Sequence, residues 1–260
     1  MSLVFYEKSH RYRLDGDWCP SPTGILSEGL PKKQLMYWSA RTVAEFVADR
    51  PDDVEQLRGM GRAAMVAALK EVPWTQRDAA AVDGTAVHNL AQALVAGDPV
   101  EVPEHLAGYV DAAVAFMDDW GVQPLVVERP LGHRAHWWAG TADLFARVRD
   151  GRVGLFDYKT GASGVWPEVA FQLAAYSHAE FYVAEDGSEH PVPAVDFCAA
   201  VWLQPGGYEV IPVRADDTVY KQFRHIAEVA KASKAAKGSK TTPGYIGEPI
   251  PAPIDIEESA

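Results

Sequence analysis

The chain has 260 residues, of which 48% are hydrophobic and 23% charged, and this composition excludes global disorder and leaves ample chain for a buried core. A balance of 24 Lys and Arg against 36 Asp and Glu gives a net charge of −12, which argues at first sight against a nucleic-acid partner. Without an apolar run of roughly 18 residues or a signal-peptide pattern, and with only two cysteines, we expect a cytoplasmic protein with no membrane partner.

The N-terminal half is predicted to be mainly helical. Residues 4–20 read as two short strands joined at Asp15-Gly16, and Ser21-Pro22-Thr23 supplies the chemistry of a helix start. Apolar residues then recur at three- and four-residue spacing, with Gly or Pro between the segments. This spacing predicts helices over 34–48, 53–70, 77–96 and 104–120.

The pattern changes after Gly121 to strands mixed with helices. We expect strands over 125–129, 139–149, 152–159, 195–204 and 208–213, and helices over 167–183 and 216–237. The fold class is therefore α/β, with a central mixed β-sheet flanked by helices and a helical N-terminal half. We expect one domain over 1–240, divided into an N-terminal part (1–80), a core (81–215) and a basic helix (216–240), followed by a Pro-rich acidic tail over 241–260.

Two carboxylates are expected to meet in the hairpin that turns at Asp150-Gly151. The turn places Asp143 and Asp157 at the same end of neighbouring strands, where facing residues lie about 5 Å apart. Two like charges at that distance favour a divalent cation with oxygen ligands. Lys159 follows Asp157 by two residues and shares its strand face. Two carboxylates and a lysine suit metal-assisted hydrolysis of a phosphodiester.

Other polar residues are placed so that they could contribute to such a site, although each also has a simpler interpretation. His88 is able to face the strands from its helix, but a lone histidine is more often packed or solvated. Gln172 and Tyr176 are one helical turn apart and suit contacts with a phosphate or a base; a core tyrosine beside a surface glutamine is the alternative. Glu128 is a supporting acid or the partner of a nearby arginine, and Thr160 follows the strand that carries Lys159.

Taken in order, four motifs resemble the PD-(D/E)XK nuclease superfamily: Gly84-Thr85-x-x-His88, Gly140-Thr141-x-Asp143, Asp157-x-Lys159-Thr160-Gly161 and Gln172-x-x-x-Tyr176. The RecB-like exonuclease branch is the most similar, in its phage-type form and near the CRISPR-associated RecB-like nucleases. The resemblance implies a restriction-endonuclease-like core. It also implies that Mg²⁺ or Mn²⁺ is bound by His88, Asp143, Asp157 and the Tyr158 carbonyl, that Lys159 is catalytic, and that Gln172 and Tyr176 form the helix pair of the branch.

The chain departs from many members of this branch in two respects. Cys19 and Cys198 are too few for the four-cysteine iron–sulfur cluster, so we expect no cluster. No phosphate-loop motif occurs, so we expect no nucleotide cofactor and assign any DNA unwinding to a partner helicase.

The resemblance implies a metal-dependent DNA nuclease, an exonuclease of recombination, repair or phage replication in a bacterial or phage-infected cytoplasm. Its partners would be DNA and a recombination protein or helicase. A catalytically silent member that binds DNA or protein is the alternative from another class. Hydrolysis of small phosphoesters is a third interpretation, which a basic C-terminal helix disfavours.

The distribution of charge reopens the question of nucleic-acid binding. Residues 221–240 hold six basic residues and one acid, a net charge of +5, which leaves −17 for the rest of the chain. Lys231, Lys234 and Lys237 form a stripe that suits a phosphate backbone, although a solvated lysine face is the usual explanation. Arg134 beside two tryptophans and Trp166 after Lys159 are further candidates for DNA contact, with core packing as the alternative for the tryptophans.

Overall fold

The computed structural model describes residues 2–96, 100–161, 164–239, 242–247 and 249. Lys240 of the basic segment and most of the expected acidic tail (241, 248 and 250–260) lie outside the described residues. Among the described helices, none has an apolar stretch long enough to cross a bilayer.

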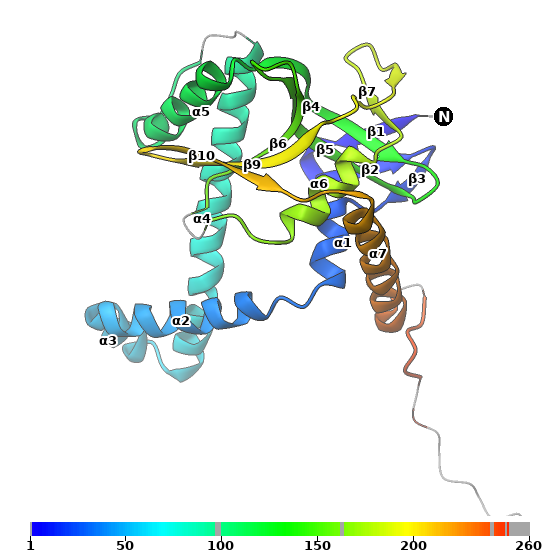
Figure 1. Ribbon diagram of the computed structural model, residues 1–260. Coiled ribbons are helices and arrows are strands. Elements are labelled where there is room, and N and C mark those ends of the chain that lie inside the picture. The colour runs from blue at the N-terminus through cyan, green and yellow to red at the C-terminus, as the bar shows by residue number, and fades with distance from the viewer. Residues whose placement is uncertain (1, 97–99, 162–163, 240–241, 248, 250–260) are drawn as a thin grey trace, which may run out of the picture.

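A seven-stranded mixed sheet forms the centre of the described fold (Figure 1). Its strand order is β10-β9-β6-β5-β4-β7-β8, and β6 and β9 run parallel while the other neighbouring pairs are antiparallel. The strands are β4 (Gln123–His133), β5 (Trp138–Arg147), β6 (Val153–Lys159), β7 (Phe181–Val183), β8 (Glu189–His190), β9 (Phe197–Gln204) and β10 (Gly207–Val213). The expected mixed sheet is confirmed.

Helices cover both faces of this sheet. On one face, α4 (Arg62–Ala96) and α5 (Ala107–Trp120) bury apolar side chains such as Val87 and Phe116 against Phe156 of β6. On the other face, α1 (Pro22–Gly29), α6 (Val169–Ser177) and α7 (Asp217–Lys237) pack around Leu155. Burial of these two apolar layers is the main stabilising contribution and holds the strand ends in place. The α/β class is confirmed.

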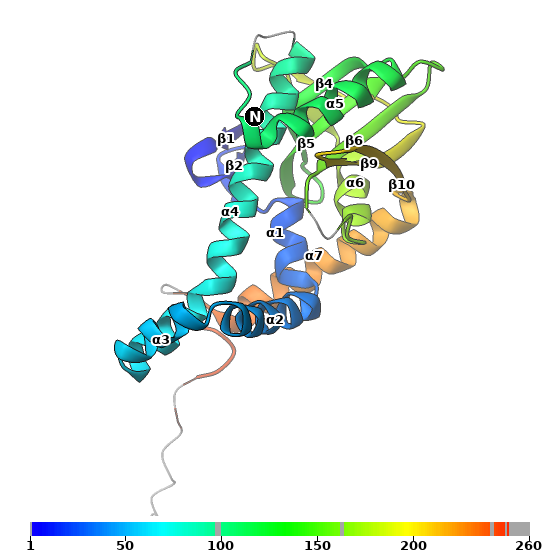
Figure 2. The same ribbon diagram turned by 90° about the vertical axis from the view of Figure 1, so that its left-hand side faces the viewer.

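The N-terminal half adds a small sheet and a projecting helical arm. Strands β1 (Leu3–Tyr6), β2 (Arg11–Leu14) and β3 (Asp17–Cys19) pack Leu14 against Ala139 and Phe181 beside the main sheet, and the Ala139 amide donates to the Pro20 carbonyl at 3.1 Å. Helices α2 (Lys33–Asp49) and α3 (Pro51–Gly59) lie with the start of α4 away from that sheet (Figure 2). Short 3₁₀ turns occupy Glu7–Ser9 and Glu104–Leu106.

Several element boundaries differ from the sequence expectation. Residues 4–20 form three strands where two were expected, and β4 extends to His133 beyond the expected 125–129. The helix expected over 53–70 is divided, because Gly61 adopts a left-handed φ of 89° between α3 and α4. α4 is then one continuous 35-residue helix with Pro73 inside it, where a break was expected. The helix expected over 167–183 ends at Ser177, because Phe181 pairs with Gly132 as an edge strand of the sheet.

Candidate metal centre

Strands β5 and β6 place two carboxylates side by side at one end of their hairpin. The pairing of Leu144 with Phe156 puts Asp143 and Asp157 in the next facing positions. The backbone amide of Tyr158 donates to Asp143 Oδ2 at 2.7 Å, so the Asp143 carboxylate lies across the end of β6. Both side chains are buried, with Asp157 only 2% exposed, and an ionised acid at that depth requires a positive neighbour. The structure thus brings these two residues together as the sequence predicts.

Glu128 is a third acid at the same place. Strand β4 pairs Val127 with Leu144 and Arg129 with Ala142, which leaves Glu128 opposite Asp143 with a left-handed φ of 46°. Ligand atoms of Glu128, Asp143 and His88 all lie within 4.8 Å of one another. Sequence analysis gave Glu128 only a supporting role. A turn at 134–137 joins β4 to β5. Counting the same number of residues backward and forward from this turn would have placed Glu128 opposite Asp143.

His88 reaches this cluster from α4. Its Nε2 lies 2.9 Å from the carbonyl oxygen of Tyr158, and its Nδ1 lies 3.5 Å from Asp143 Oδ2. A glycine one turn earlier permits this close approach, because a Cβ at Gly84 would lie 3.2 Å from Thr160 Oγ1 at the end of β6. The imidazole, the Tyr158 carbonyl and the Asp143 carboxylate therefore converge, as the sequence predicts.

Lys159 forms an ion pair with Asp157 on the same face of β6. Burial and the nearby Asp143 raise the pKa of Asp157, and Lys159 opposes that rise. Burial alone would lower the pKa of Lys159, but the carboxylates of Asp157 and Asp143 outweigh it and raise that pKa. The ammonium therefore remains charged at neutral pH, held against one buried carboxylate.

Glu128 is also affected by burial and by the neighbouring acids. Burial, then Asp143, then Asp157 raise the pKa of Glu128 to about 8. The single ammonium of Lys159 does not balance three carboxylates in a partly buried site. Carboxylate and carbonyl oxygens are ligands that hard ions such as Mg²⁺ and Mn²⁺ prefer, so these side chains are compatible with the metal that the family resemblance implies.

The two α6 residues lie beside the cluster on the opposite face of the sheet from α4. Tyr176 is buried against Gly140, where a Cβ would lie 2.8 Å from the tyrosine Cε1. Gln172 Nε2 lies 3.5 Å from the Tyr176 hydroxyl, and burial raises the pKa of Tyr176, so the phenol stays protonated. Tyr12 adds a hydroxyl 2.9 Å from Thr141 Oγ1, two residues before Asp143. Tyr12 was not among the site residues expected from the sequence.

The residues expected to contact DNA lie outside this cluster. The Arg134 guanidinium pairs with Asp15 at 2.9 Å and Glu189 at 2.7 Å, which fixes it within the protein. Lys237 pairs with Glu28. Trp166 is 42% exposed in the segment between β6 and α6. Lys231 and Lys234 line a separate groove beside α7.

Comparisons with known proteins give no family. No protein-family model and no curated protein matches the chain. A solved structure described as "Crystal structure of SSO0001" is similar over 51% of this chain, with 14% identity and a TM-score of 0.27. The similar region spans 60% of that protein. A TM-score this low supports no conclusion about fold or function.

Proposed function

We propose that the chain is a divalent-metal-dependent deoxyribonuclease with the restriction-endonuclease-like core of the PD-(D/E)XK superfamily. The observation that carries this proposal is the convergence of His88, Glu128, Asp143 and the Asp157–Lys159 ion pair at one end of β5 and β6. These residues come from three consecutive strands and from a helix that precedes them in the chain. A binding module has no need to bury so many charges at one point.

The metal would be held by His88, Asp143, Asp157 and the carbonyl of Tyr158, with Glu128 as a further ligand that the geometry adds. A bound Mg²⁺ or Mn²⁺ supplies Lewis acidity toward a phosphoryl oxygen and lowers the pKa of a coordinated water. A hard ion bound by several carboxylates would also explain why the acids lie so close together that they raise one another's pKa values.

The other side chains of the site orient the substrate and balance the charge that develops on it. Lys159 directs an ammonium into the site from beside Asp157, where it stabilises negative charge that develops on the scissile phosphate. The partly exposed Gln172 amide offers a hydrogen-bond donor for a phosphate or a base, and the buried Tyr176 hydroxyl lies 3.5 Å from its Nε2 and orients it. The Nε2–H of His88 donates to the Tyr158 carbonyl, which fixes the orientation of its ring.

The more specific assignment, to a branch of the superfamily, rests on the resemblance of the four sequence motifs to that branch. We place the enzyme in the RecB-like exonuclease branch, as a stand-alone nuclease of recombination, repair or phage replication in a bacterial or phage-infected cytoplasm. DNA is the substrate, and a recombination protein or helicase is the further partner. The described cysteines, Cys19 and Cys198, lie in separate sheets and do not support an iron–sulfur cluster.

The test is cleavage of end-labelled single- and double-stranded DNA in Mg²⁺, Mn²⁺ or EDTA. We expect cutting with either metal and none in EDTA. Asp157→Asn should reduce the rate at least about 100-fold, the scale of losing one group that stabilises the transition state. Asp111→Asn, on the exposed side of α5, is the matched control and should cut like the wild type. Wild-type protein that binds DNA but leaves it intact in both metals would instead indicate a catalytically silent member.

A further inference from the structure

A groove of about 940 Å³ lies beside the small N-terminal sheet and is separate from the metal ligands. Its walls come from β2 and β3, the start of α1, the turn at 135–137 and one side of α7. In Figure 1 these segments lie together, with α1 and α7 side by side below the small sheet. The groove is not lined by the proposed metal ligands His88, Glu128, Asp143 and Asp157. Its chemistry is therefore considered separately from that of the candidate metal centre.

The groove is basic in an acidic protein. The Lys and Arg side chains in its lining are Arg11, Lys221, Arg224, Lys231 and Lys234, and the carboxylate among the described lining residues is Glu228. Within the described part of the chain, none of the five cations forms an ion pair, unlike Arg134 and Lys237 nearby. Uncompensated positive charge in a concave surface attracts a polyanion, because low-dielectric walls concentrate the field.

Two tryptophans give the groove exposed aromatic surface as well. Trp137 is 38% exposed and holds a left-handed φ of 52°, a conformation that a bulky residue rarely adopts. Trp18 is 42% exposed, and the guanidinium of Arg11 lies 3.9 Å from the centre of its ring. Aromatic rings and guanidinium planes between phosphate-binding cations are the combination that binds unpaired bases. The bases of a duplex stack on one another and offer no free face to such rings.

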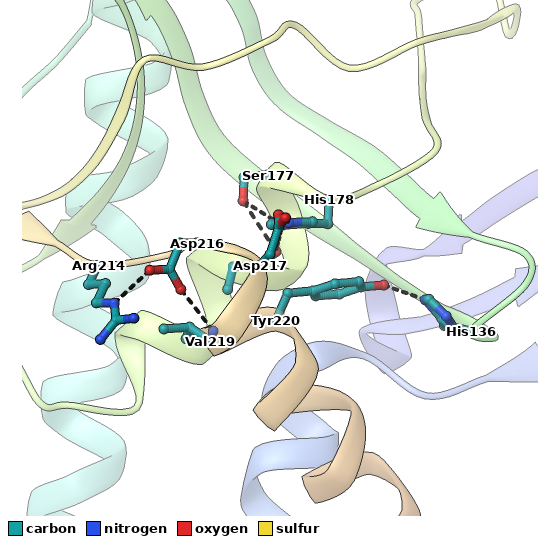
Figure 3. Close-up of polar contacts among 9 residues, drawn as sticks. His136, Ser177, His178, Arg214, Asp216, Asp217, Val219 and Tyr220 are labelled. Atoms are coloured by element: carbon teal, nitrogen blue, oxygen red, sulfur yellow. Dashed lines mark hydrogen bonds and ion pairs between the residues drawn. The ribbon is translucent and has the colours of Figure 1, made fainter.

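The walls of the groove are held together by polar contacts at the start of α7 (Figure 3). The Tyr220 hydroxyl lies 2.6 Å from Nδ1 of His136, which joins α7 to the turn at 135–137. His178, after α6, pairs with Asp217 at 2.9 Å and stacks on the Tyr220 ring with centroids 4.4 Å apart. The backbone segments that carry the α7 cations and Trp137 are therefore held together before any ligand arrives, which lowers the entropy lost on binding.

We propose that this groove binds a single strand of DNA next to the carboxylate site. The inference rests on the proposed nuclease function and names the form of its substrate. Tyr12 connects the groove to the carboxylate site, because it lines the groove and forms a hydrogen bond with Thr141, two residues before Asp143 on β5. Phosphates contact the α7 cations while bases stack on Trp137 and on the Arg11–Trp18 pair.

The test measures binding in EDTA, where no metal-dependent cutting occurs, by the anisotropy of a fluorescent single-stranded oligothymidylate. The double substitution Lys231→Gln/Lys234→Gln should weaken binding and reduce the slope of log K against log salt by about 1.4, at about 0.7 per lost phosphate contact. Lys33→Gln/Lys70→Gln removes the same charge from exposed positions on α2 and α4 and should bind like the wild type.

Trp137→Asn tests stacking without straining the turn, because asparagine tolerates the left-handed conformation. It should weaken binding at least about fivefold, the low end of one base–aromatic stack. Wild-type affinity in both groove variants would overturn the proposal, as would a duplex of equal length that competes as strongly as the single strand. Groove-dependent binding without cutting in metal would contradict only the nuclease function, so the two failures are distinguishable.

Discussion

At the scale of single residues, the site is organised by acids that repel one another. Asp143, Asp157 and Glu128 come from three neighbouring strands, and burial raises the pKa of Glu128 to about 8. Such an arrangement costs stability when no cation is present, and under the proposed function a bound divalent ion would restore the balance. Removing an acid should therefore stabilise the metal-free protein while it weakens metal binding.

Glu128→Gln tests this trade-off. The unfolded wild type releases the Glu128 proton near pH 4.5, but the folded, metal-free protein holds it to about pH 8. Wild-type stability in EDTA therefore falls as pH rises from 4.5 to 8, and the glutamine variant lacks that part of the decline. At pH 8 we expect the variant to be more stable by up to about 4 kcal/mol in urea unfolding.

The control for this experiment is the same unfolding series with Mn²⁺. The ion should stabilise the wild type more than Glu128→Gln, because ligand binding stabilises the folded state according to its affinity. Identical pH dependence of the two proteins in EDTA would contradict the placement of Glu128 among the acids.

At the scale of helices and strands, the sequence predicts those features that short-range residue patterns encode. The turn at Asp150-Gly151 and the alternating strands around it place Asp143 beside Asp157, and the 3.6-residue period predicts most of the helices. Long-range pairing is what local patterns miss. Phe181 forms a strand because it pairs with Gly132, a residue distant in the chain. Glu128 was given too small a role for a different reason, because its strand was expected to end at 129 but runs to His133 and pairs with β5 across a local turn.

The start of α7 offers a test of how one element is fixed. The Asp216 side chain accepts the Val219 amide at 3.0 Å and also pairs with Arg214 (Figure 3). Asp216→Ala removes the helix cap and should lower the free energy of unfolding by about 1 kcal/mol. Amide exchange in the first turn of α7 should become faster.

Asp216→Asn is the matched variant, because asparagine caps helices about as well as aspartate and loses only the exposed ion pair with Arg214. It should retain nearly all of the stability. If the asparagine variant lost as much as the alanine variant, the cap would not be what holds α7.

At the scale of the whole molecule, the total charge of −12 is a poor guide to partners. Negative charge gathers around the proposed metal, and unpaired positive charge gathers in the groove beside α7. Of the basic residues that the sequence singled out, the structure engages Arg134 and Lys237 in ion pairs and leaves Lys231 and Lys234 facing the groove. Spacing along a helix predicts a stripe, but ion pairs formed after folding decide which charges stay available.

The most direct test of the central claim is the cleavage rate of 5′-labelled DNA in Mn²⁺ by Lys159→Met, compared with Lys70→Met. Lys159 lies against Asp157 in the site, whereas Lys70 is exposed on α4. We predict that Lys159→Met folds but cuts at least about 100-fold more slowly, because it lacks the ammonium that stabilises developing charge. Lys70→Met should cut like the wild type. Equal cutting by both variants, or wild-type cutting that persists in EDTA, would contradict the account.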